Sequence, residues 1–313
     1  PAWANSLFED NAEFGFGMAI GVEKLRNRIS LKMQEALNAD FSSEAKTIME
    51  EWINSKDHAN ASVETSAKVI DVLKKEKNSL ATEILDLKQY LIKKSQWIFG
   101  GDGWAYDIGF GGLDHVLASG EDVNVLVMDT EVYSNTGGQS SKASPTGSVA
   151  KFAAAGKKTR KKDLGAMVMT YGYVYVAQIA MGASQSQAFK AIKEAEEYPG
   201  PSLIIAYSPC IAHGIKGGMS GAQYEEKYAV EAGYWHNYRY NPLAEAQGKN
   251  PFTLDSKKPD WQKFQEFLNN EVRYASLKKT FPEEARKLFA ESEEDAKWRY
   301  NNYLRLSLID FSK

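Results

Sequence analysis

The hydrophobic positions of this chain change their spacing part-way along it. In the N-terminal part they recur at helical intervals in two sets: Met18, Val22, Leu25, Ile29 and Met33, then Leu80, Ile84, Leu87 and Leu91. Between these sets, residues 40–44 supply Asp and Ser side chains of the kind that cap the start of a helix. We therefore predict three helical stretches before residue 95, amphipathic and serving in packing and support.

From residue 97 onward, short and wholly apolar runs alternate with helical stretches. The predicted strands are residues 97–99, 123–129, 173–177 and 203–207, and the predicted helices between them are 108–117 and 185–198. Strands that are apolar throughout and alternate with helices are typical of a buried parallel sheet. We predict an α/β fold, with a mostly parallel sheet covered by helices on both faces, a helical N-terminal segment and a C-terminal helical arm.

These changes in pattern suggest three parts. Residues 1–95 form a helical segment packed on the α/β core, residues 96–234 form the core, and residues 235–313 form an arm and helices. The last part is aromatic and polar at first, and helices are predicted at 261–274 and from 283 onward. The chain opens on Pro1 rather than Met, so we expect the first domain to begin before residue 1.

Composition narrows the class of protein. The chain has 313 residues, of which 43% are hydrophobic and 25% charged, and its net charge is -3. A general nucleic-acid binder would be distinctly basic, so that class is excluded. No apolar run reaches the ~20 residues that span a bilayer, and no signal peptide is present. The single cysteine, Cys210, excludes an internal disulfide and predicts a reducing, cytoplasmic location.

Polar residues follow two predicted strands at the ends where ligands bind in such sheets. Asp102 lies between Gly101 and Gly103 after the first strand, and Thr130 follows the second. A carboxylate with a hydroxyl and a free backbone carbonyl can surround one hard cation with oxygens, which Mg²⁺ prefers. The glycines and the following helix N-terminus would admit a diphosphate. Gly-Asp-Gly alone is more often a plain turn, but the second loop favours a metal–diphosphate site.

Here a resemblance becomes specific. Residues 101–115 and 130–139 resemble the thiamin diphosphate motif of the pyruvate:ferredoxin (flavodoxin) oxidoreductases. The resemblance continues through residues 140–143, 151–157, 169–174 and 247–252, and it reaches back to 1–17. Thr130 stands where thiamin enzymes in general have Asn, and this family is similar to the chain in having Thr. The resemblance implies a thiamin-diphosphate-binding fold.

The resemblance also assigns roles to the two loops. Asp102, Thr130 and the backbone carbonyl of Val132 would hold Mg²⁺. Asn135 would be catalytic, lying at the reacting carbon and binding pyruvate or its adduct. The residues expected to bind the cofactor are Gly101, Asp102, Gly103, Trp104, Thr130, Glu131, Val132, Tyr133, Ser134 and Asn135.

Cys210 is the second candidate site, at the carboxyl end of the predicted strand 203–207. Taken alone, such a cysteine is usually a small buried hydrophobe. The resemblance implies that Cys210 is the fourth ligand of a [4Fe-4S] cluster whose other three ligands lie upstream of residue 1. We therefore expect that this chain cannot hold a cluster by itself.

Two weaker features have simple interpretations. The basic run 157–162 predicts a solvated loop, with binding of an anion such as a CoA phosphate as the alternative. Asp122 and Asn124 offer oxygens for a surface Ca²⁺, although an ordinary polar surface is the more frequent outcome.

The resemblance implies oxidative decarboxylation of pyruvate with CoA to acetyl-CoA and CO2, with electrons passing through [4Fe-4S] clusters to ferredoxin or flavodoxin. The expected partners are these carriers, the remaining domains of the same enzyme and a second copy in a homodimer, with no nucleic acid and no membrane. We expect this chain alone to be inactive. Two alternatives stay open: another 2-oxoacid or pyruvate:NADP oxidoreductase, and a non-catalytic assembly fragment.

Overall fold

The computed structural model describes residues 11–311, which fall into two compact units. One unit is Phe14–Gln96, and the other combines the described part of Pro1–Glu13 with Trp97–Lys313. Most of the predicted resemblance over residues 1–17 lies outside the described residues.

The Phe14–Gln96 unit is helical, as predicted, but it contains four α-helices where three helical stretches were predicted. Its elements are α2 (Ala12–Leu37), α3 (Ser43–Ser55), α4 (Ala59–Leu73), α5 (Ser79–Asp86) and the 3-10 turn η1 (Lys88–Tyr90). The predicted cap is confirmed, because the Ser42 hydroxyl accepts a hydrogen bond from the Ala45 backbone N–H at 3.2 Å. The α5 helix ends earlier than the apolar repeat predicted, because η1 takes over before Leu91.

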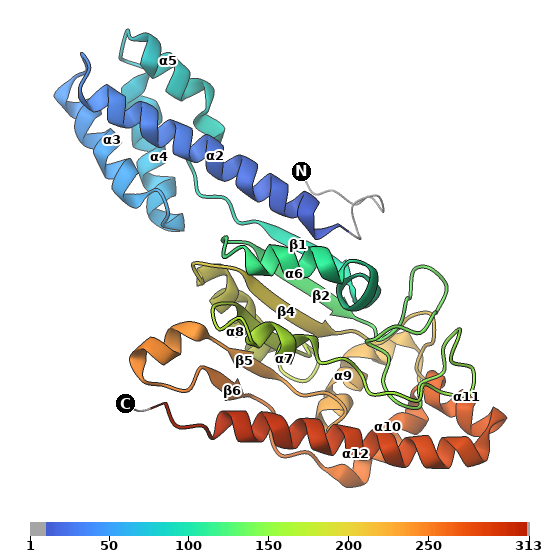
Figure 1. The fold of residues 1–313 in the computed structure, drawn as a ribbon. Helices are drawn as coiled ribbons and strands as arrows, with labels where there is room; N and C mark the ends of the chain where they lie inside the picture. Colours follow the sequence, from blue (N-terminus) through green and yellow to red (C-terminus); the bar gives the residue numbers. More distant parts are fainter. Residues whose placement is uncertain (1–10, 312–313) are drawn as a thin grey trace. The chain divides into compact units, whose positions relative to one another are not determined.

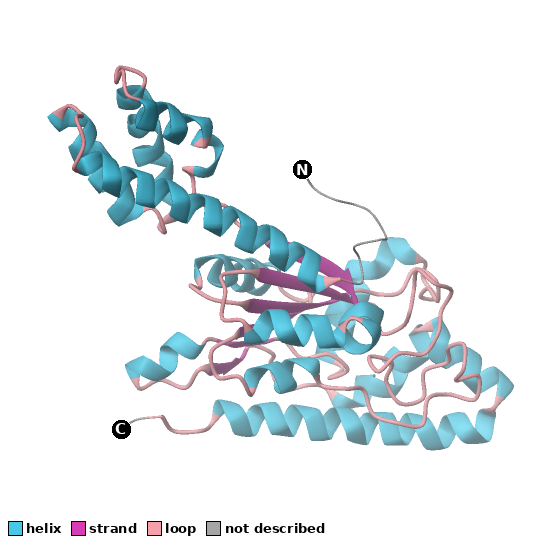
Figure 2. Cartoon of the chain, turned by 45° about the horizontal axis from the view of Figure 1, so that its top comes forward, coloured by secondary structure: helices cyan, strands magenta, loops and turns pink. Residues whose placement is uncertain are grey.

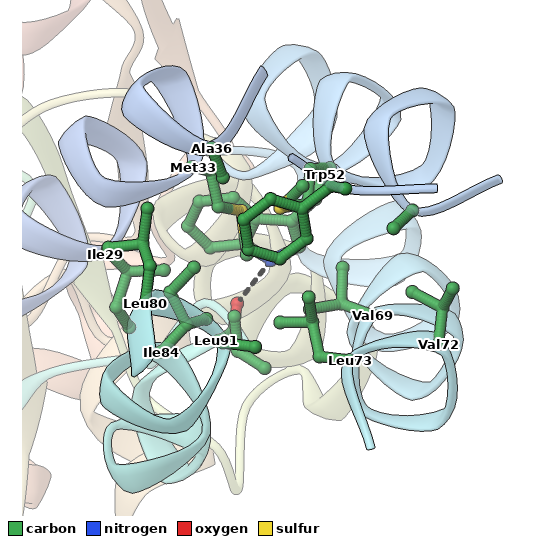
Figure 3. Packing of buried hydrophobic residues seen from close by; sticks show 14 residues of the cluster. Ile29, Met33, Ala36, Trp52, Val69, Val72, Leu73, Leu80, Ile84 and Leu91 are labelled. Atoms are coloured by element: carbon green, nitrogen blue, oxygen red, sulfur yellow. Dashed lines mark hydrogen bonds between the residues drawn. The ribbon is translucent and has the colours of Figure 1, made fainter. Parts of the chain in front are cut away.

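A tryptophan lies at the centre of this unit (Figure 3). The Trp52 ring is fully buried among aliphatic side chains, and its Nε1 donates to the Leu91 carbonyl at 3.1 Å. The buried Arg26 donates to the same carbonyl at 2.8 Å, so two side chains fix the end of the unit. These contacts are those of a packing unit, and none of the predicted site residues lies in it.

The other unit is built on one six-stranded sheet, in the order β1-β2-β4-β3-β5-β6 (Figures 1 and 2). The strands are β1 (Trp97–Gly101), β2 (Asn124–Asp129), β3 (Tyr175–Ile179), β4 (Ser202–Tyr207), β5 (Tyr238–Tyr240) and β6 (Phe252–Leu254). The pairs β1–β2, β2–β4 and β4–β3 are parallel, and the pairs β3–β5 and β5–β6 are antiparallel. The predicted mostly parallel sheet is confirmed, and two short strands extend it.

Helices cover both faces of this sheet (Figure 2). On one face, Ile204 packs with β3 residues against the alanines of α8 (Gln185–Glu197). On the other face, α7 (Leu164–Met169) packs so closely that a Cβ at Gly165 would lie 3.6 Å from Ile205. Since Ile204 and Ile205 are successive strand residues, their side chains point to opposite faces.

Further helices complete this unit: the π-helical turn η2 (Trp104–Ile108), α6 (Phe110–Ala118), η3 (Met219–Gly221), α9 (Ala222–Glu231) and η4 (Pro242–Gln247). The prediction of one helix over 261–274 is wrong. The chain forms η5 (Trp261–Lys263) and α10 (Phe264–Asn270), becomes extended at Glu271, and resumes as α11 (Val272–Thr280). The break occurs because the Val272 N–H bonds to the Gly214 carbonyl, at 3.2 Å, instead of continuing α10.

The helix predicted from residue 283 is confirmed as α12 (Pro282–Ser307). Within the described part of the chain, no helix combines the length and apolar character that a bilayer crossing requires.

The predicted site residues lie in loops that follow the carboxyl ends of three strands. The strands β1, β2 and β4 are neighbours and run parallel, so their carboxyl ends meet at one edge of the sheet. The loops after Gly101, Asp129 and Tyr207 start from this edge, and these loops contain Asp102, Thr130 and Cys210.

Candidate cofactor and metal site

The three predicted metal ligands converge at the ends of β1 and β2. The Thr130 hydroxyl lies 2.8 Å from the Asp102 carboxylate oxygen Oδ1 and 3.1 Å from the Val132 carbonyl oxygen. The Thr130 backbone N–H also donates to Asp102 Oδ1, at 3.1 Å. A carboxylate, a hydroxyl and a backbone carbonyl thus share one small space, and this all-oxygen set fits a hard cation such as Mg²⁺.

The electrostatics of Asp102 also fit a cation. Burial raises the pKa of Asp102 to about 7, and the nearby charge of Asp129 adds to the effect. The Ser141 hydroxyl donates to the second carboxylate oxygen of Asp102 at 3.2 Å. A divalent cation beside Asp102 would favour its ionised form, because an opposite charge offsets the cost of desolvation.

Three glycines near Asp102 leave no room for a side chain, whereas a Cβ at Gly101 would have no heavy atom within 4 Å. A Cβ at Gly100 or Gly109 would lie 2.2 Å or 2.1 Å from the Trp104 ring, and a Cβ at Gly103 would lie 2.5 Å from the Tyr133 ring. Gly103 and Tyr133 therefore bring the two loops into contact. Trp104 begins the π-helical turn, a form found frequently at functional sites. Its buried Nε1 has no hydrogen-bond partner among residues 11–311.

Asn135 lies at the tip of a tight loop. The loop is closed by the Tyr133 N–H, which donates to the Gln139 carbonyl at 3.0 Å, and by the Gly138 N–H, which donates to the Tyr133 carbonyl at 2.7 Å. The Asn135 side chain is exposed, and within the described chain it makes no hydrogen bond. The left-handed backbone in this loop belongs to Gly137 and Gly138, with φ of 119° and 84°, and not to Asn135.

Glu131 has a different environment from its neighbours. Its carboxylate is buried and accepts hydrogen bonds from the Lys161 ammonium, at 3.0 Å, and from the Tyr234 hydroxyl. Burial alone would raise the pKa of Glu131, but the charges of Lys161 and Arg273 outweigh it and hold that pKa below its ordinary value. The side chain faces the interior of the unit, so a contact between Glu131 and the cofactor stays a prediction.

Three residues near the site were not predicted from the sequence. The Asp129 carboxylate accepts from Lys161 at 2.6 Å and from the Tyr106 hydroxyl at 2.7 Å, beneath the loop that holds Thr130. Arg273, from α11, donates to the Thr130 carbonyl at 3.1 Å. Asp129 could have been found as the polar end of an apolar strand, whereas Lys161 and Arg273 give no local signal.

Cys210 lies beside the loop that follows β2 and contains Val132 and Ser134. Its side chain is buried against Val132 and Ala150, and its sulfur is 3.6 Å from the Ser134 hydroxyl. This contact follows from the strand order, because β4 is the neighbour of β2. A [4Fe-4S] cluster needs four thiolates, and this chain has one cysteine. The structure therefore brings Cys210 to the candidate site, and its role as a cluster ligand stays a prediction.

Comparison with known proteins agrees with this geometry. Residues 86–206 match the family described as "Thiamine pyrophosphate enzyme, C-terminal TPP binding domain". Over 98% of its length, the chain is 57% identical to the "Pyruvate-flavodoxin oxidoreductase" of Klebsiella pneumoniae and 59% identical to the "Pyruvate:ferredoxin oxidoreductase" of Moorella thermoacetica. The predicted resemblance is confirmed.

The chain covers 26% and 27% of these two relatives, so it spans about a quarter of their length. A third relative is the mitochondrial "Pyruvate dehydrogenase [NADP(+)]" of Euglena gracilis, which is 46% identical over 98% of this chain and of which the chain covers 17%. The thiamine pyrophosphate-binding domain, residues 86–206, contains Asp102, Thr130, Val132 and Asn135. Cys210 and Arg273 lie outside it.

The basic run of the thiamine pyrophosphate-binding domain is only partly solvated. Lys161 is 9% exposed, so its interpretation as part of a solvated loop is wrong: the buried carboxylates of Asp129 and Glu131 compensate its charge. A cleft of about 390 Å³ lies beside it, lined by Asp107, Ser140, Ser141, Lys142, Lys157, Thr159, Arg160 and Lys162. Burial lowers the pKa of both Lys157 and Lys162 to about 8. Anion binding in this cleft stays a prediction.

The two residues considered for Ca²⁺ lie elsewhere in the thiamine pyrophosphate-binding domain. Asn124 begins β2, so it lies at the sheet edge opposite the Thr130 loop. Its side chain is buried, and its Oδ1 accepts a hydrogen bond from the Ser202 hydroxyl at 2.5 Å. Asp122 is exposed beside it. The structure does not bring either residue to the predicted Mg²⁺ ligands, and the Ca²⁺ site stays a prediction.

Proposed function

We propose that this chain is the thiamin diphosphate- and Mg²⁺-binding portion of an enzyme that oxidatively decarboxylates pyruvate. The observation that carries the proposal is the convergence of Asp102, Thr130 and Val132 oxygens at the ends of adjacent strands. Mg²⁺ held by few protein oxygens keeps positions for diphosphate oxygens and water. The names of the relatives support pyruvate as the 2-oxo acid.

In the proposed reaction, pyruvate and CoA give acetyl-CoA, CO2, one proton and two electrons. Bound thiamin diphosphate supplies the nucleophilic carbon and the electron sink that decarboxylation needs. Asp102 and Thr130 hold the metal, and the Asn135 amide orients the oxygen of the substrate. Cys210 is the fourth ligand of a [4Fe-4S] cluster, and electrons leave to ferredoxin or flavodoxin. The other partners are the remaining domains and a second copy, in the cytoplasm.

Removal of the metal and the cofactor tests the proposal. Dialysis of the full-length protein against EDTA should abolish pyruvate-dependent reduction of flavodoxin, because Asp102 and Thr130 bind the diphosphate through the metal. Mg²⁺ and thiamin diphosphate added together should restore the rate, and neither should do so alone. Full activity after both are removed, or recovery with thiamin diphosphate in the absence of any metal, would contradict the proposal.

The NADP-linked alternative has one observation in its favour, the similarity to the Euglena gracilis protein. Its 46% identity is below the 57% of the Klebsiella pneumoniae protein, so flavodoxin or ferredoxin is the preferred acceptor. Direct pyruvate-dependent reduction of NADP⁺ by the purified full-length protein would favour the alternative. Faster turnover of a different 2-oxo acid in the same assay would favour another 2-oxoacid oxidoreductase.

Cys210→Ala should remove the iron of one [4Fe-4S] cluster from the full-length protein and leave any other cluster in place. The expected reason is the loss of one of the four thiolates that hold this cluster. Iron analysis and the EPR spectrum of the reduced protein measure the effect. Ser134→Ala is the control, because it removes the neighbouring hydroxyl and keeps the thiol. Unchanged iron content and spectrum in Cys210→Ala would make Cys210 a packing residue.

A further inference from the structure

The loop that carries Thr130, residues 129–132, has an unusual backbone. Glu131 has φ of 64°, in the left-handed region that favours glycine. Its N–H bonds back to the Asp129 carboxylate at 3.1 Å, and its carbonyl accepts from the Ser144 hydroxyl at 2.6 Å. Such a conformation persists only where the surroundings hold it in place.

Arg273 contacts this loop at two points. Its Nη1 donates to the Thr130 carbonyl at 3.1 Å and lies 3.4 Å from the Glu131 carboxylate. Its Nε donates to Glu271 at 3.1 Å, which fixes the guanidinium from the other side. Arg273 is 1% exposed, so little water competes for these contacts. The Arg273 guanidinium therefore donates a hydrogen bond to the main chain of Thr130, a predicted metal ligand, and forms an ion pair with the side chain of Glu131, the next residue.

We infer that Arg273 is a positioning residue for the metal site, and this inference rests on the proposed function. By holding the Thr130 carbonyl and Glu131, Arg273 fixes the backbone from which the Thr130 hydroxyl reaches both the Asp102 carboxylate and the Val132 carbonyl. A lysine cannot replace it, because an ammonium is a single point of charge without the fork that reaches three partners at once.

Arg239 offers a matched control in the same unit. Like Arg273 it is held by two carboxylates, with Nη1 2.7 Å from Glu194 and Nε 2.9 Å from Asp255, although Arg239 is only partly buried. It lies in β5, at the far side of the sheet from β1 and β2. Arg239→Lys should therefore weaken a pair of ion pairs, as Arg273→Lys does, without touching the loop.

The experiment compares the two variants in the full-length protein. Thiamin diphosphate is titrated at saturating Mg²⁺, and the thermal midpoint is measured without cofactor. Both variants should lower the midpoint, but Arg273→Lys should raise the Kd at least tenfold, whereas Arg239→Lys should leave it within twofold. An unchanged Kd in Arg273→Lys, or equal changes in both variants, overturns the inference. Absence of binding in the wild type overturns the proposed function as well.

If Arg273→Lys does not fold, hydrogen–deuterium exchange of the wild type decides. Addition of Mg²⁺ and thiamin diphosphate should slow exchange in residues 129–132 and in Val272–Thr280 together, because Arg273 couples them. The peptide containing Arg239 should not change. Protection of the loop without protection of Val272–Thr280 overturns the inference.

Discussion

Asp102→Ala is expected to abolish thiamin diphosphate binding by the full-length protein, with a loss of affinity of about 100-fold or more, or about 3 kcal/mol. Asp102 is the one carboxylate among the three predicted metal ligands, so its removal leaves Mg²⁺ with neutral oxygens only. The buried carboxylate also accepts bonds from the Thr130 N–H and hydroxyl and from Ser141, and the alanine variant loses these as well.

Asp102→Asn separates the two effects. The amide keeps an oxygen for Thr130 but carries no charge, so it should preserve the loop and still bind Mg²⁺ poorly. Asp163→Asn is the control, because Asp163 caps α7 through the Ala166 N–H and lies outside the site. The measurement is calorimetric titration of thiamin diphosphate with Mg²⁺ present. An undiminished affinity in Asp102→Asn and Asp102→Ala would refute the assignment of the metal.

Asn135→Ala should lower the rate of pyruvate oxidation about 10²- to 10³-fold, or about 3–4 kcal/mol, which is typical for the loss of one oxyanion donor. Thiamin diphosphate affinity should be nearly intact, because the three predicted metal ligands do not include Asn135. Asn135→Asp should be worse than Asn135→Ala, since it places a negative charge where negative charge develops or where the carboxylate of pyruvate lies. Steady-state rates, with cofactor binding measured in parallel, check both expectations.

The rival explanation of Asn135 is that asparagine tolerates a left-handed backbone. The structure gives this explanation no support, because Gly137 and Gly138 have the positive φ values of this loop. Asn135→Gly should therefore be as slow as Asn135→Ala. Thr136→Ala is the neighbouring control and should change the rate only a few-fold. Near-normal turnover in Asn135→Gly would remove Asn135 from the mechanism.

The parts of the fold that the sequence predicts correctly are those with strong local patterns. The apolar runs of β1, β2 and β4 predicted the parallel strands, and the polar residues after β1 and β2 are the predicted metal ligands. The short strands β5 and β6 escaped prediction, since a segment such as Tyr238–Tyr240 has too few residues to show a period. The break at Glu271 also escaped, because apolar residues keep their helical spacing across it and the competing bond comes from Gly214.

The residues of the site also differ in whether a local sequence motif identifies them. Asp102, Thr130 and Val132 belong to two local motifs, so the sequence could place them together. The charges beneath them could not be predicted, because Lys161 lies in a run of cations that resembles a surface loop. The partners of Lys161 and Arg273 are distant in sequence, and only the folded sheet brings them to residues 129–132.

The hydrogen bond between Arg273 and the Thr130 carbonyl joins residues 143 positions apart. During synthesis of the chain, this bond can therefore form only long after Thr130 has been made. A ribosome releases β1, β2, β3 and β4 well before α11, and domains generally begin to form from their N-terminal side as the chain emerges. The four parallel strands can then assemble while the loop over them still lacks its anchor. If Arg273 positions this loop as inferred, residues 129–132 reach their final conformation only after α11 has packed against strands formed earlier.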